Sequence, residues 1–170
     1  MTLNDTNLPD AEQLLTRLAA QLKPVITAET ALVGIHSGGV WLMERLLPIL
    51  GKQLEHGRLD ISFYRDDYDK RGLHEGTKPS QIPFEVEGRH IILIDDVFYT
   101  GRTIRAAMNE LFDYGRPASI SLAVLVNRGG RELPIAPQFS AHEMHLAAHQ
   151  NLQLMQDDGG RFYLTVEESH

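Results

Sequence analysis

The stretch that decides the fold is Ile91-Ile92-Leu93-Ile94-Asp95-Asp96-Val97-Phe98-Tyr99-Thr100-Gly101-Arg102-Thr103. Its aliphatic run is typical of a strand buried on both faces, as in a parallel sheet covered by helices. The run changes at once into two carboxylates and a short loop, and a helix is predicted from Thr103 to Tyr114, capped by Gly115. Polar groups at the carboxyl end of a strand, next to a helix N-terminus, predict a ligand site at the mouth of an α/β sheet.

Helices and strands alternate along the rest of the chain. We predict a helix capped by Asp10 and stopping near Pro24, a strand at 31–36, a helix at 40–50, strands at 59–65 and 118–126, and a hairpin across 151–166. Residues 68–83 are polar and broken by glycine and proline, which indicates either a lid over an active site or an insertion or hairpin. This order predicts an α/β fold in a single domain over residues 1–170: a central, mainly parallel sheet flanked by helices, with a flexible loop and a C-terminal β-hairpin.

The composition narrows the class of protein. The chain has 170 residues, a net charge of -7 and no cysteine, which excludes disulfides, thiolate metal sites and a cysteine nucleophile. The missing cysteines suit a reducing compartment and residues 1–5 show no signal peptide, so we expect a cytoplasmic protein. No apolar run reaches membrane-spanning length. The negative charge argues against bulk electrostatic binding of nucleic acid, although arginines cluster beside predicted loops.

The two halves of the opening stretch favour different chemical groups. The loop at 97–101 and the following helix start offer backbone donors, Thr100 and Thr103 add hydroxyls, and Arg102 adds charge, which together suit a monophosphate. Asp95 and Asp96 repel a phosphate, but they accept hydrogen bonds from a sugar diol or hold a hydrated divalent cation. A phosphorylated sugar satisfies both halves. The alternatives are an ordinary helix cap at Thr100 and, for the aspartates, one cap and one surface residue.

Two further patterns carry weaker signals. The turn Ser37-Gly38-Gly39 leads from a strand into a helix, so its N–H groups are candidates for binding an anion, although many α/β turns contain glycines. His142, His145 and His149 lie at helical spacing and could together bind a transition metal, but solvated surface histidines are the better interpretation. The chain has no P-loop, no dinucleotide-binding glycine motif and no His-Glu-x-x-His motif.

The opening stretch resembles the thirteen-residue signature by which type I phosphoribosyltransferases bind phosphoribosyl pyrophosphate (PRPP). Its Asp-Asp-Val-x-Tyr-Thr-Gly-Arg-Thr form is similar to the PyrR family, which combines a pyrimidine operon regulator with a uracil phosphoribosyltransferase. The likeness covers roughly Leu32 to Ile135 and includes four other segments: Tyr64–Asp67, Ile82–Phe84, Gly115–Ile120 and Arg131–Ile135.

The resemblance implies a type I phosphoribosyltransferase fold and a reaction in which uracil and PRPP give UMP and pyrophosphate. Mg2+ would be bound through PRPP, with no direct protein ligand. The implied catalytic residues are Asp95, Asp96 and Arg65, and the two aspartates would meet the ribose hydroxyls. PRPP would also contact Val97, Phe98, Tyr99, Thr100, Gly101, Arg102 and Thr103, which hold the 5′-phosphate. The other implied sites are a pyrophosphate loop of His36, Ser37, Gly38 and Gly39, a flexible loop beginning Arg65, Asp66 and Asp67, and a base pocket near Asn127 and Arg128.

The resemblance also implies partners, and the chain departs from the family at two places. Such proteins form dimers or larger homo-oligomers, and some bind a messenger RNA leader. The family loop reads Gly-Ile-x-Thr-Arg-Gly, whereas Gly38 stands here in place of the arginine, which predicts weaker PRPP binding or turnover. Residues 132–160 contain no lysine or arginine, although RNA-binding members have basic residues there. The alternatives are a non-catalytic sensor of pyrimidine nucleotides that acts on RNA or a protein, an enzyme for another base, and an inactive oligomerising homologue.

Overall fold

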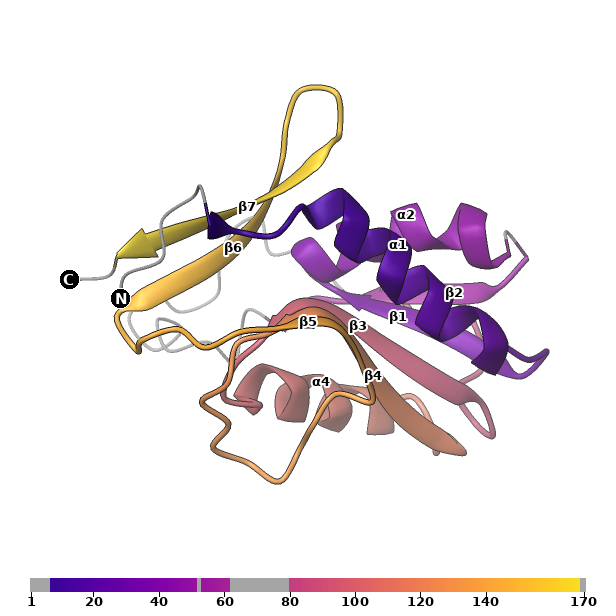
Figure 1. Ribbon diagram of the computed structural model, residues 1–170. Helices are drawn as coiled ribbons and strands as arrows, with labels where there is room; N and C mark the ends of the chain where they lie inside the picture. Colours follow the sequence, from indigo (N-terminus) through magenta and orange to yellow (C-terminus); the bar gives the residue numbers. More distant parts are fainter. Residues whose placement is uncertain (1–6, 52, 62–79, 169–170) are drawn as a thin grey trace.

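The opening stretch forms β3 (His90–Phe98), the middle strand of a five-stranded sheet (Figure 1). The computed structural model describes residues 7–51, 53–61 and 80–168. All strand pairs in this sheet are parallel, which confirms the predicted fold class. The strand order is β2-β1-β3-β4-β5, with β1 at Thr30–Ile35, β2 at Glu55–Leu59, β4 at Ser119–Asn127 and β5 at Phe139–Glu143.

Helices cover both faces of the sheet, as Figure 1 shows. α1 (Ala11–Leu22) and α2 (Gly38–Leu50) pack on one face, and α4 (Arg102–Phe112) packs on the other. α1 begins as predicted, because the Asp10 carboxylate accepts a hydrogen bond from the Glu12 N–H at 2.9 Å. It is followed by a short 3-10 turn, η2 (Lys23–Val25), which contains Pro24. Alternate residues of β3 therefore enter two separate apolar cores.

Glycines allow α2 to approach the sheet backbone closely. A Cβ atom on Gly39 would collide with the carbonyl oxygen of Ile94 in β3, and one on Gly34 would lie 2.9 Å from the carbonyl oxygen of Gly39. These two positions therefore cannot carry a side chain without moving backbone. As a result α2 begins at Gly38, two residues earlier than predicted, and its N-terminus reaches the end of β3.

The predicted C-terminal hairpin is present, with β6 (Gln150–Gln156) antiparallel to β7 (Phe162–Glu168). Glu12 of α1 joins this hairpin to α2. Its carboxylate accepts hydrogen bonds from Arg45 at 2.6 and 3.1 Å and from the Phe162 N–H at 2.8 Å. Arg45 also donates to the Gly160 carbonyl at 3.1 Å and lies 4.8 Å from the centre of the Phe162 ring. One ion pair thus holds the hairpin to the helical layer.

Several predicted boundaries are wrong. The strand predicted from residue 59 onward is instead β2, which ends at Leu59, because the chain leaves the sheet at Asp60, whose N–H donates to Ser80 Oγ at 3.0 Å. Residues 62–65 lie outside the described residues. α4 ends at Phe112 rather than Tyr114 and is capped by Asp113 rather than Gly115, because the Asp113 N–H already turns to the carbonyl oxygens of the last helical turn.

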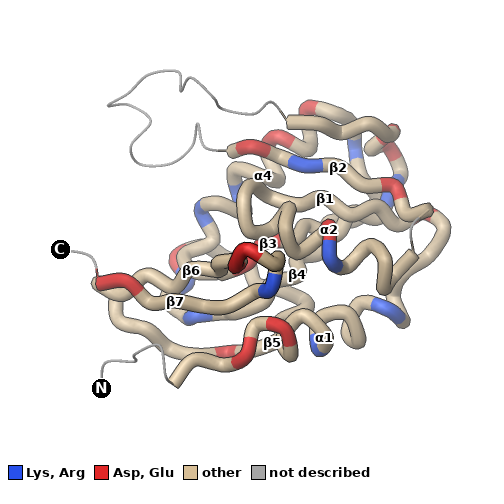
Figure 2. The backbone as a smooth tube through the Cα atoms, turned by 90° about the horizontal axis from the view of Figure 1, so that it is seen from above, with Lys and Arg blue, Asp and Glu red and all other residues tan. Residues whose placement is uncertain are grey.

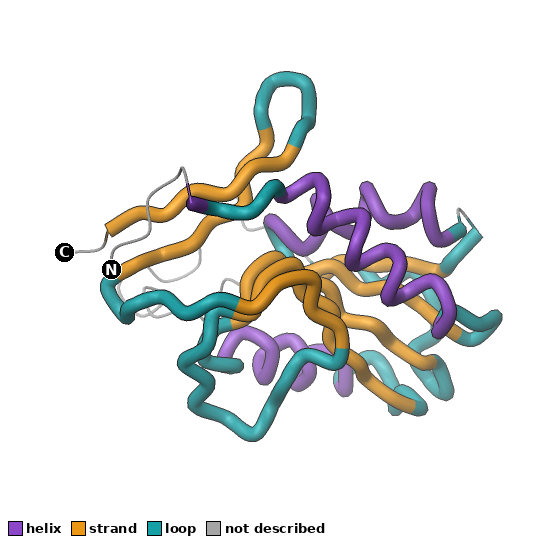
Figure 3. Tube along the Cα trace, in the orientation of Figure 1, coloured by secondary structure: helices purple, strands orange, loops and turns teal. Residues whose placement is uncertain are grey.

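The region between β4 and the hairpin also differs from the prediction. It contains β5, an edge strand whose half-exposed residues show no clear alternation of apolar and polar side chains. The connections on either side of β5 are loops (Figure 3). His142 lies in β5, whereas His145 and His149 lie in the following loop, so the three histidines do not share a helix face. No group of three potential metal ligands occurs among the described residues. Across all residues that the structure describes, no helix has the length and apolar character needed to cross a bilayer.

Substitution Glu12→Gln tests how the hairpin is held. The hydrogen bond from Arg45 lowers the pKa of the Glu12 carboxyl, partial burial opposes this shift, and the Phe162 N–H adds to it. A lowered folded-state pKa contributes stability above the ordinary value of 4.5 that is lost as the pH falls through the folded-state pKa. We therefore expect the substitution to lower the free energy of unfolding by about 1 kcal/mol near neutral pH, and by less under acid.

Urea titrations at about pH 7 and about pH 4 measure this difference. Glu85→Gln is the matched control, since Glu85 is exposed and belongs to no contact described above. An effect of Glu12→Gln that stays the same at both pH values contradicts the assignment.

Candidate functional site

The two carboxylates lie on β3 itself and not in the loop after it, because the strand continues through Asp95 and Asp96 to Phe98. Asp95 is buried, with 8% of its surface exposed, and its Oδ1 accepts a hydrogen bond from the Asp96 N–H at 2.9 Å. Asp96 is half-buried, and its Oδ1 accepts from the Val97 N–H at 2.9 Å. Main-chain donors therefore fix both carboxylates at the carboxyl end of the central strand.

Gly38 brings the predicted pyrophosphate loop against Asp96. A Cβ atom on Gly38 would lie 2.6 Å from Asp96 Cγ and closer still to Oδ2, so the carboxylate occupies the space that any side chain at residue 38 would enter. The carboxylate also lies at the N-terminus of α2, where the helix dipole favours negative charge. The sequence indicated Gly38 as part of an anion-binding turn and as the position of a lost arginine, but it gave no sign of the contact with Asp96. The structure shows that glycine at this position makes room for a carboxylate.

The rest of the predicted pyrophosphate loop lies between β1 and α2. Ser37 is exposed and precedes the first residue of α2, and His36 is half-buried. The His36 N–H donates to the Leu59 carbonyl at 3.0 Å, and the peptide bond between His36 and Ser37 is cis. The loop, the start of α2 and the end of β3 therefore form one edge of the sheet.

The predicted phosphate loop, residues Val97–Thr103, joins β3 to α4. Gly101 precedes α4 with a φ of 98°, a left-handed conformation that glycine adopts without strain. Thr100 Oγ1 accepts a hydrogen bond from the Arg102 N–H at 3.2 Å, which makes Thr100 part of the helix cap. Beyond it, the first turn of α4 presents N–H groups that have no partner within the helix, and such groups suit an anion.

Arg102 is not a free cation in this loop. Its Nε donates to Glu132 Oε1 at 2.9 Å, and its side chain is 65% exposed. The Glu132 N–H donates to the Thr100 carbonyl at 2.9 Å, so the segment after β4 is tied to the phosphate loop. Arg102, whose charge was predicted to help bind the phosphate, is therefore already paired with the Glu132 carboxylate. No pattern in the sequence indicated this pairing.

The two predicted base-pocket residues have structural partners. Asn127 ends β4, and its Oδ1 accepts from the Gly129 N–H at 3.2 Å. Arg128 is buried and donates to two main-chain carbonyls, those of Gln150 and Ala147. Its guanidinium carbon lies 3.9 Å from the centre of the Tyr99 ring. Burial lowers the pKa of Arg128, whereas the nearby Tyr99 raises it.

The remaining predicted residues fall elsewhere. Arg65, Asp66 and Asp67 lie outside the described residues. His149 faces Glu168, with 3.1 Å between Nε2 and Oε2, and so has a partner on the hairpin. The structure therefore brings together Asp95, Asp96, the 36–39 turn and the phosphate loop.

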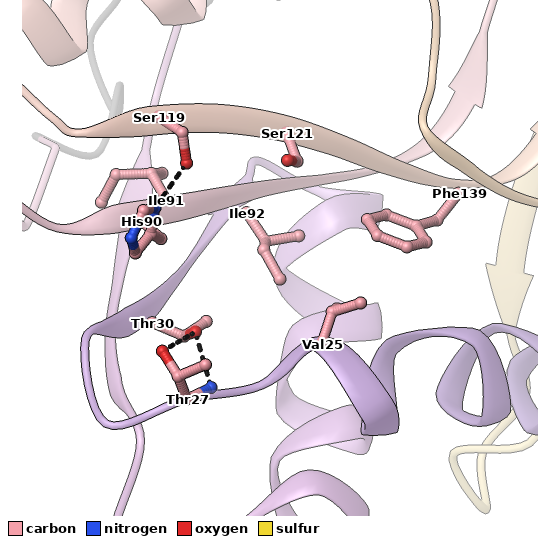
Figure 4. Close-up of a pocket in the computed structure, with 9 residues that line it drawn as sticks. All are labelled: Val25, Thr27, Thr30, His90, Ile91, Ile92, Ser119, Ser121 and Phe139. Atoms are coloured by element: carbon pink, nitrogen blue, oxygen red, sulfur yellow. Dashed lines mark hydrogen bonds between the residues drawn. The ribbon is translucent and has the colours of Figure 1, made fainter.

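A cavity of 340 Å³ lies at the opposite end of the sheet, where β1, β3 and β4 begin (Figure 4). Figure 4 shows apolar side chains and hydroxyls around the cavity. His90 Nδ1 and Ser119 Oγ form a hydrogen bond of 2.7 Å at its border. Its lining contains no aspartate, glutamate, lysine or arginine: Val25, Thr27, Thr30, His90, Ile91, Ile92, Ser119, Ser121 and Phe139. The charges that suit a sugar phosphate are at the other end, so this cavity is not the site predicted from the sequence.

The chain is similar in sequence and in fold to known proteins. The family described as "Phosphoribosyl transferase domain" matches residues 5–145. A "Bifunctional protein PyrR" of Pseudomonas fluorescens is 48% identical over 152 residues, which are 87% of this chain and 90% of that protein. The protein of the same name from Ralstonia nicotianae is 50% identical over 165 residues, which are 93% of this chain and 94% of that protein.

Solved structures resemble the fold at low sequence identity. A hypoxanthine phosphoribosyltransferase from Staphylococcus aureus has a TM-score of 0.60 at 18% identity, over 79% of this chain and 73% of that one. A purine phosphoribosyltransferase from Pyrococcus horikoshii has a TM-score of 0.60 at 23% identity, over 79% and 82% of the two chains. These structures support the architecture alone, whereas the sequence matches identify the family. The chain belongs to the phosphoribosyl transferase domain family and, within it, to the PyrR proteins.

Proposed function

We propose that this protein transfers the phosphoribosyl group of PRPP to uracil, giving UMP and pyrophosphate. The observation that carries the proposal is the meeting of three elements at one edge of the sheet: the Asp95 and Asp96 carboxylates, the glycine turn at 36–39 and the phosphate loop. Carboxylates suit the ribose hydroxyls, and the two helix starts suit anions at either end of the sugar. The relatives named bifunctional PyrR support the choice of uracil.

The chain's own groups can support each part of the displacement. A uracil ring nitrogen forms the new bond to the anomeric carbon as the bond from that carbon to the pyrophosphate oxygen breaks, and the proton of that nitrogen leaves with the pyrophosphate. Positive charge develops on the sugar ring, and the carboxylates of Asp95 and Asp96 stabilise it from a fixed position. The N–H groups of the 36–39 turn receive the leaving pyrophosphate, and the phosphate loop holds the 5′-phosphate. No protein nucleophile is required.

The donor set also suits Mg2+ carried by PRPP. Asp95 and Asp96 are neighbouring carboxylates, and such hard oxygen donors would hold a hydrated Mg2+ that arrives with PRPP. The ion would neutralise charge on the leaving pyrophosphate. Asp96 lies at the N-terminus of α2, between the sugar side and the predicted pyrophosphate side, so it is the carboxylate we assign to this contact.

Regulation through pyrimidine-operon RNA is the second candidate function, and the names of the relatives favour it. UMP would occupy the same phosphate loop. The charge distribution gives this function less support, because basic positions in Figure 2 are dispersed among acidic ones and residues 132–160 carry no lysine or arginine. Binding to a leader RNA that strengthens with UMP and weakens steeply with salt would establish it.

A second copy of this chain is the protein partner that we expect.

Asp95→Asn and Asp96→Asn test the assignment of the carboxylates. Each substitution keeps a hydrogen-bond acceptor and removes the negative charge that the developing cation needs. We expect kcat/KM for Mg2+- and PRPP-dependent UMP formation to fall about 100-fold. Asp113→Asn, at an exposed carboxylate beyond α4, is the control and should keep normal turnover. Unchanged kinetics in both variants, or no turnover of uracil with any PRPP concentration in the parent protein, would sink the proposal. A panel of other bases then decides the substrate.

Gly38 provides a test in which structure and family pattern disagree. The family arginine suggests that Gly38→Arg improves the enzyme, whereas its Cβ would displace the Asp96 carboxylate. We expect Gly38→Ala and Gly38→Arg each to raise the KM for PRPP about tenfold while the protein stays folded, because a carboxylate can rotate away. Gly159→Ala is the control, since its Cβ would meet only Asp157 Oδ1, at 3.4 Å. Higher activity in Gly38→Arg would contradict the role given to Asp96.

A further inference from the structure

The loop after β4, residues 127–130, lies between the phosphate loop and the segment that leads into the hairpin. We call that segment, residues 144–149, the hairpin lead. On one side, the Arg128 N–H donates to the Phe98 carbonyl at 3.1 Å. On the other side, the Asn127 carbonyl accepts from the Met144 N–H at 2.9 Å. The loop is therefore bonded through its backbone to both neighbours.

The Arg128 side chain also contacts both sides, the phosphate loop and the segment that leads into the hairpin. Nη1 donates to the carbonyl of Gln150, the first residue of β6, at 2.5 Å, and Nη2 donates to the Ala147 carbonyl of the hairpin lead at 2.8 Å. The same guanidinium packs on the ring of Tyr99 in the phosphate loop, with 3.9 Å from its carbon to the ring centre. Only 3% of Arg128 is exposed. One buried cation thus contacts the phosphate loop and the hairpin at the same time.

Two glycines of this loop pack so closely against neighbouring side chains that neither has room for a Cβ atom. Gly129 and Gly130 have φ values of 75° and 92°, in the left-handed region. A Cβ on Gly129 would lie 2.7 Å from His145 Nδ1 of the hairpin lead, and one on Gly130 would lie 2.5 Å from Tyr99 Cε1. The loop is consequently packed against the His145 ring on one side and the Tyr99 ring on the other.

The contacts also show that both Nη atoms of the Arg128 side chain are used within the protein. Nη1 and Nη2 donate to main-chain carbonyls, one face of the planar guanidinium is covered by the Tyr99 ring, and the buried Nε has no hydrogen-bond partner among the described residues. Charge-assisted hydrogen bonds of this kind are about twice as strong as neutral ones. A lysine cannot reproduce them, because it lacks the planar fork that reaches two carbonyls while stacking on a ring.

We propose that Arg128 is a positioning residue that fixes the phosphate loop against the hairpin, and so preorganises the loop for a 5′-phosphate. The inference rests on the proposed function in one respect, that this loop receives the phosphate of a phosphorylated ribose. Donor groups that are already ordered bind a ligand more tightly, because no ordering cost is paid on binding. Loss of Arg128 therefore weakens ligands that carry a 5′-phosphate and spares a ligand of the 36–39 turn.

Calorimetric titration with two probes separates these cases. For Arg128→Met, we expect the Kd of ribose 5-phosphate to rise about tenfold, while the Kd of magnesium pyrophosphate changes by less than about twofold. Arg128→Lys should fall short of full rescue. Arg116→Met is the matched control, because Arg116 is exposed and follows α4, at the end of the sheet where β4 begins. It should leave both affinities unchanged.

A second pair of variants covers the case in which Arg128→Met does not fold. Tyr99→Leu removes the ring beneath the guanidinium, and Tyr99→Phe keeps it. We expect Tyr99→Leu to weaken ribose 5-phosphate and to spare magnesium pyrophosphate, and we expect Tyr99→Phe to weaken ribose 5-phosphate less than Tyr99→Leu does. Equal weakening of both probes by Arg128→Met, or no weakening of either, overturns the inference, as does failure of the parent protein to bind ribose 5-phosphate. Binding of ribose 5-phosphate without any uracil turnover would reject the proposed function and leave this inference standing.

Discussion

The site depends on the close approach of α2 to the central strand. Gly34 and Gly39 allow helix backbone to lie directly on strand backbone, and a Cβ at Gly39 would collide with the Ile94 carbonyl. This approach carries the N-terminus of α2 to the end of β3, where Gly38 leaves space for the Asp96 carboxylate. A positive helix end and a negative side chain are thereby held together. The contact between Asp96 and Gly38 therefore lies where the part of the site that we assign to the sugar meets the part predicted to hold pyrophosphate.

The hairpin is attached at two points with different chemistry. At the helical layer, the Glu12–Arg45 pair is partly exposed and contributes modest stability that depends on pH. At the sheet edge, Arg128 is buried and bonded to carbonyls, so its geometry is fixed and independent of nearby carboxylates among the described residues. The second attachment reaches the phosphate loop through Tyr99. The hairpin is therefore part of the frame of the site as well as an appended sheet.

Much of the fold and half of the site could be predicted from local sequence. The aliphatic run of β3 and the leucine spacing of α1 are set by burial, and burial leaves a periodic pattern. β2 was misplaced and β5 was missed, because edge strands of polar residues leave no such pattern. The roles of Gly38 and Arg128 could not be predicted, because each depends on a partner far away in the chain, Asp96 in one case and Gln150 in the other. The resemblance placed Arg128 near the base pocket, which stays a prediction, and it gave no sign of the contacts that Arg128 makes with Gln150 and Tyr99.

A crystal structure of the protein with PRPP and Mg2+ tests the central claim most directly. The account predicts ribose hydroxyls within hydrogen-bonding distance of the Asp95 and Asp96 carboxylates, and the 5′-phosphate on the backbone N–H groups of residues Val97–Thr103. PRPP bound in the cavity beside Thr30 and His90 would contradict it. So would a sugar that makes no contact with either carboxylate.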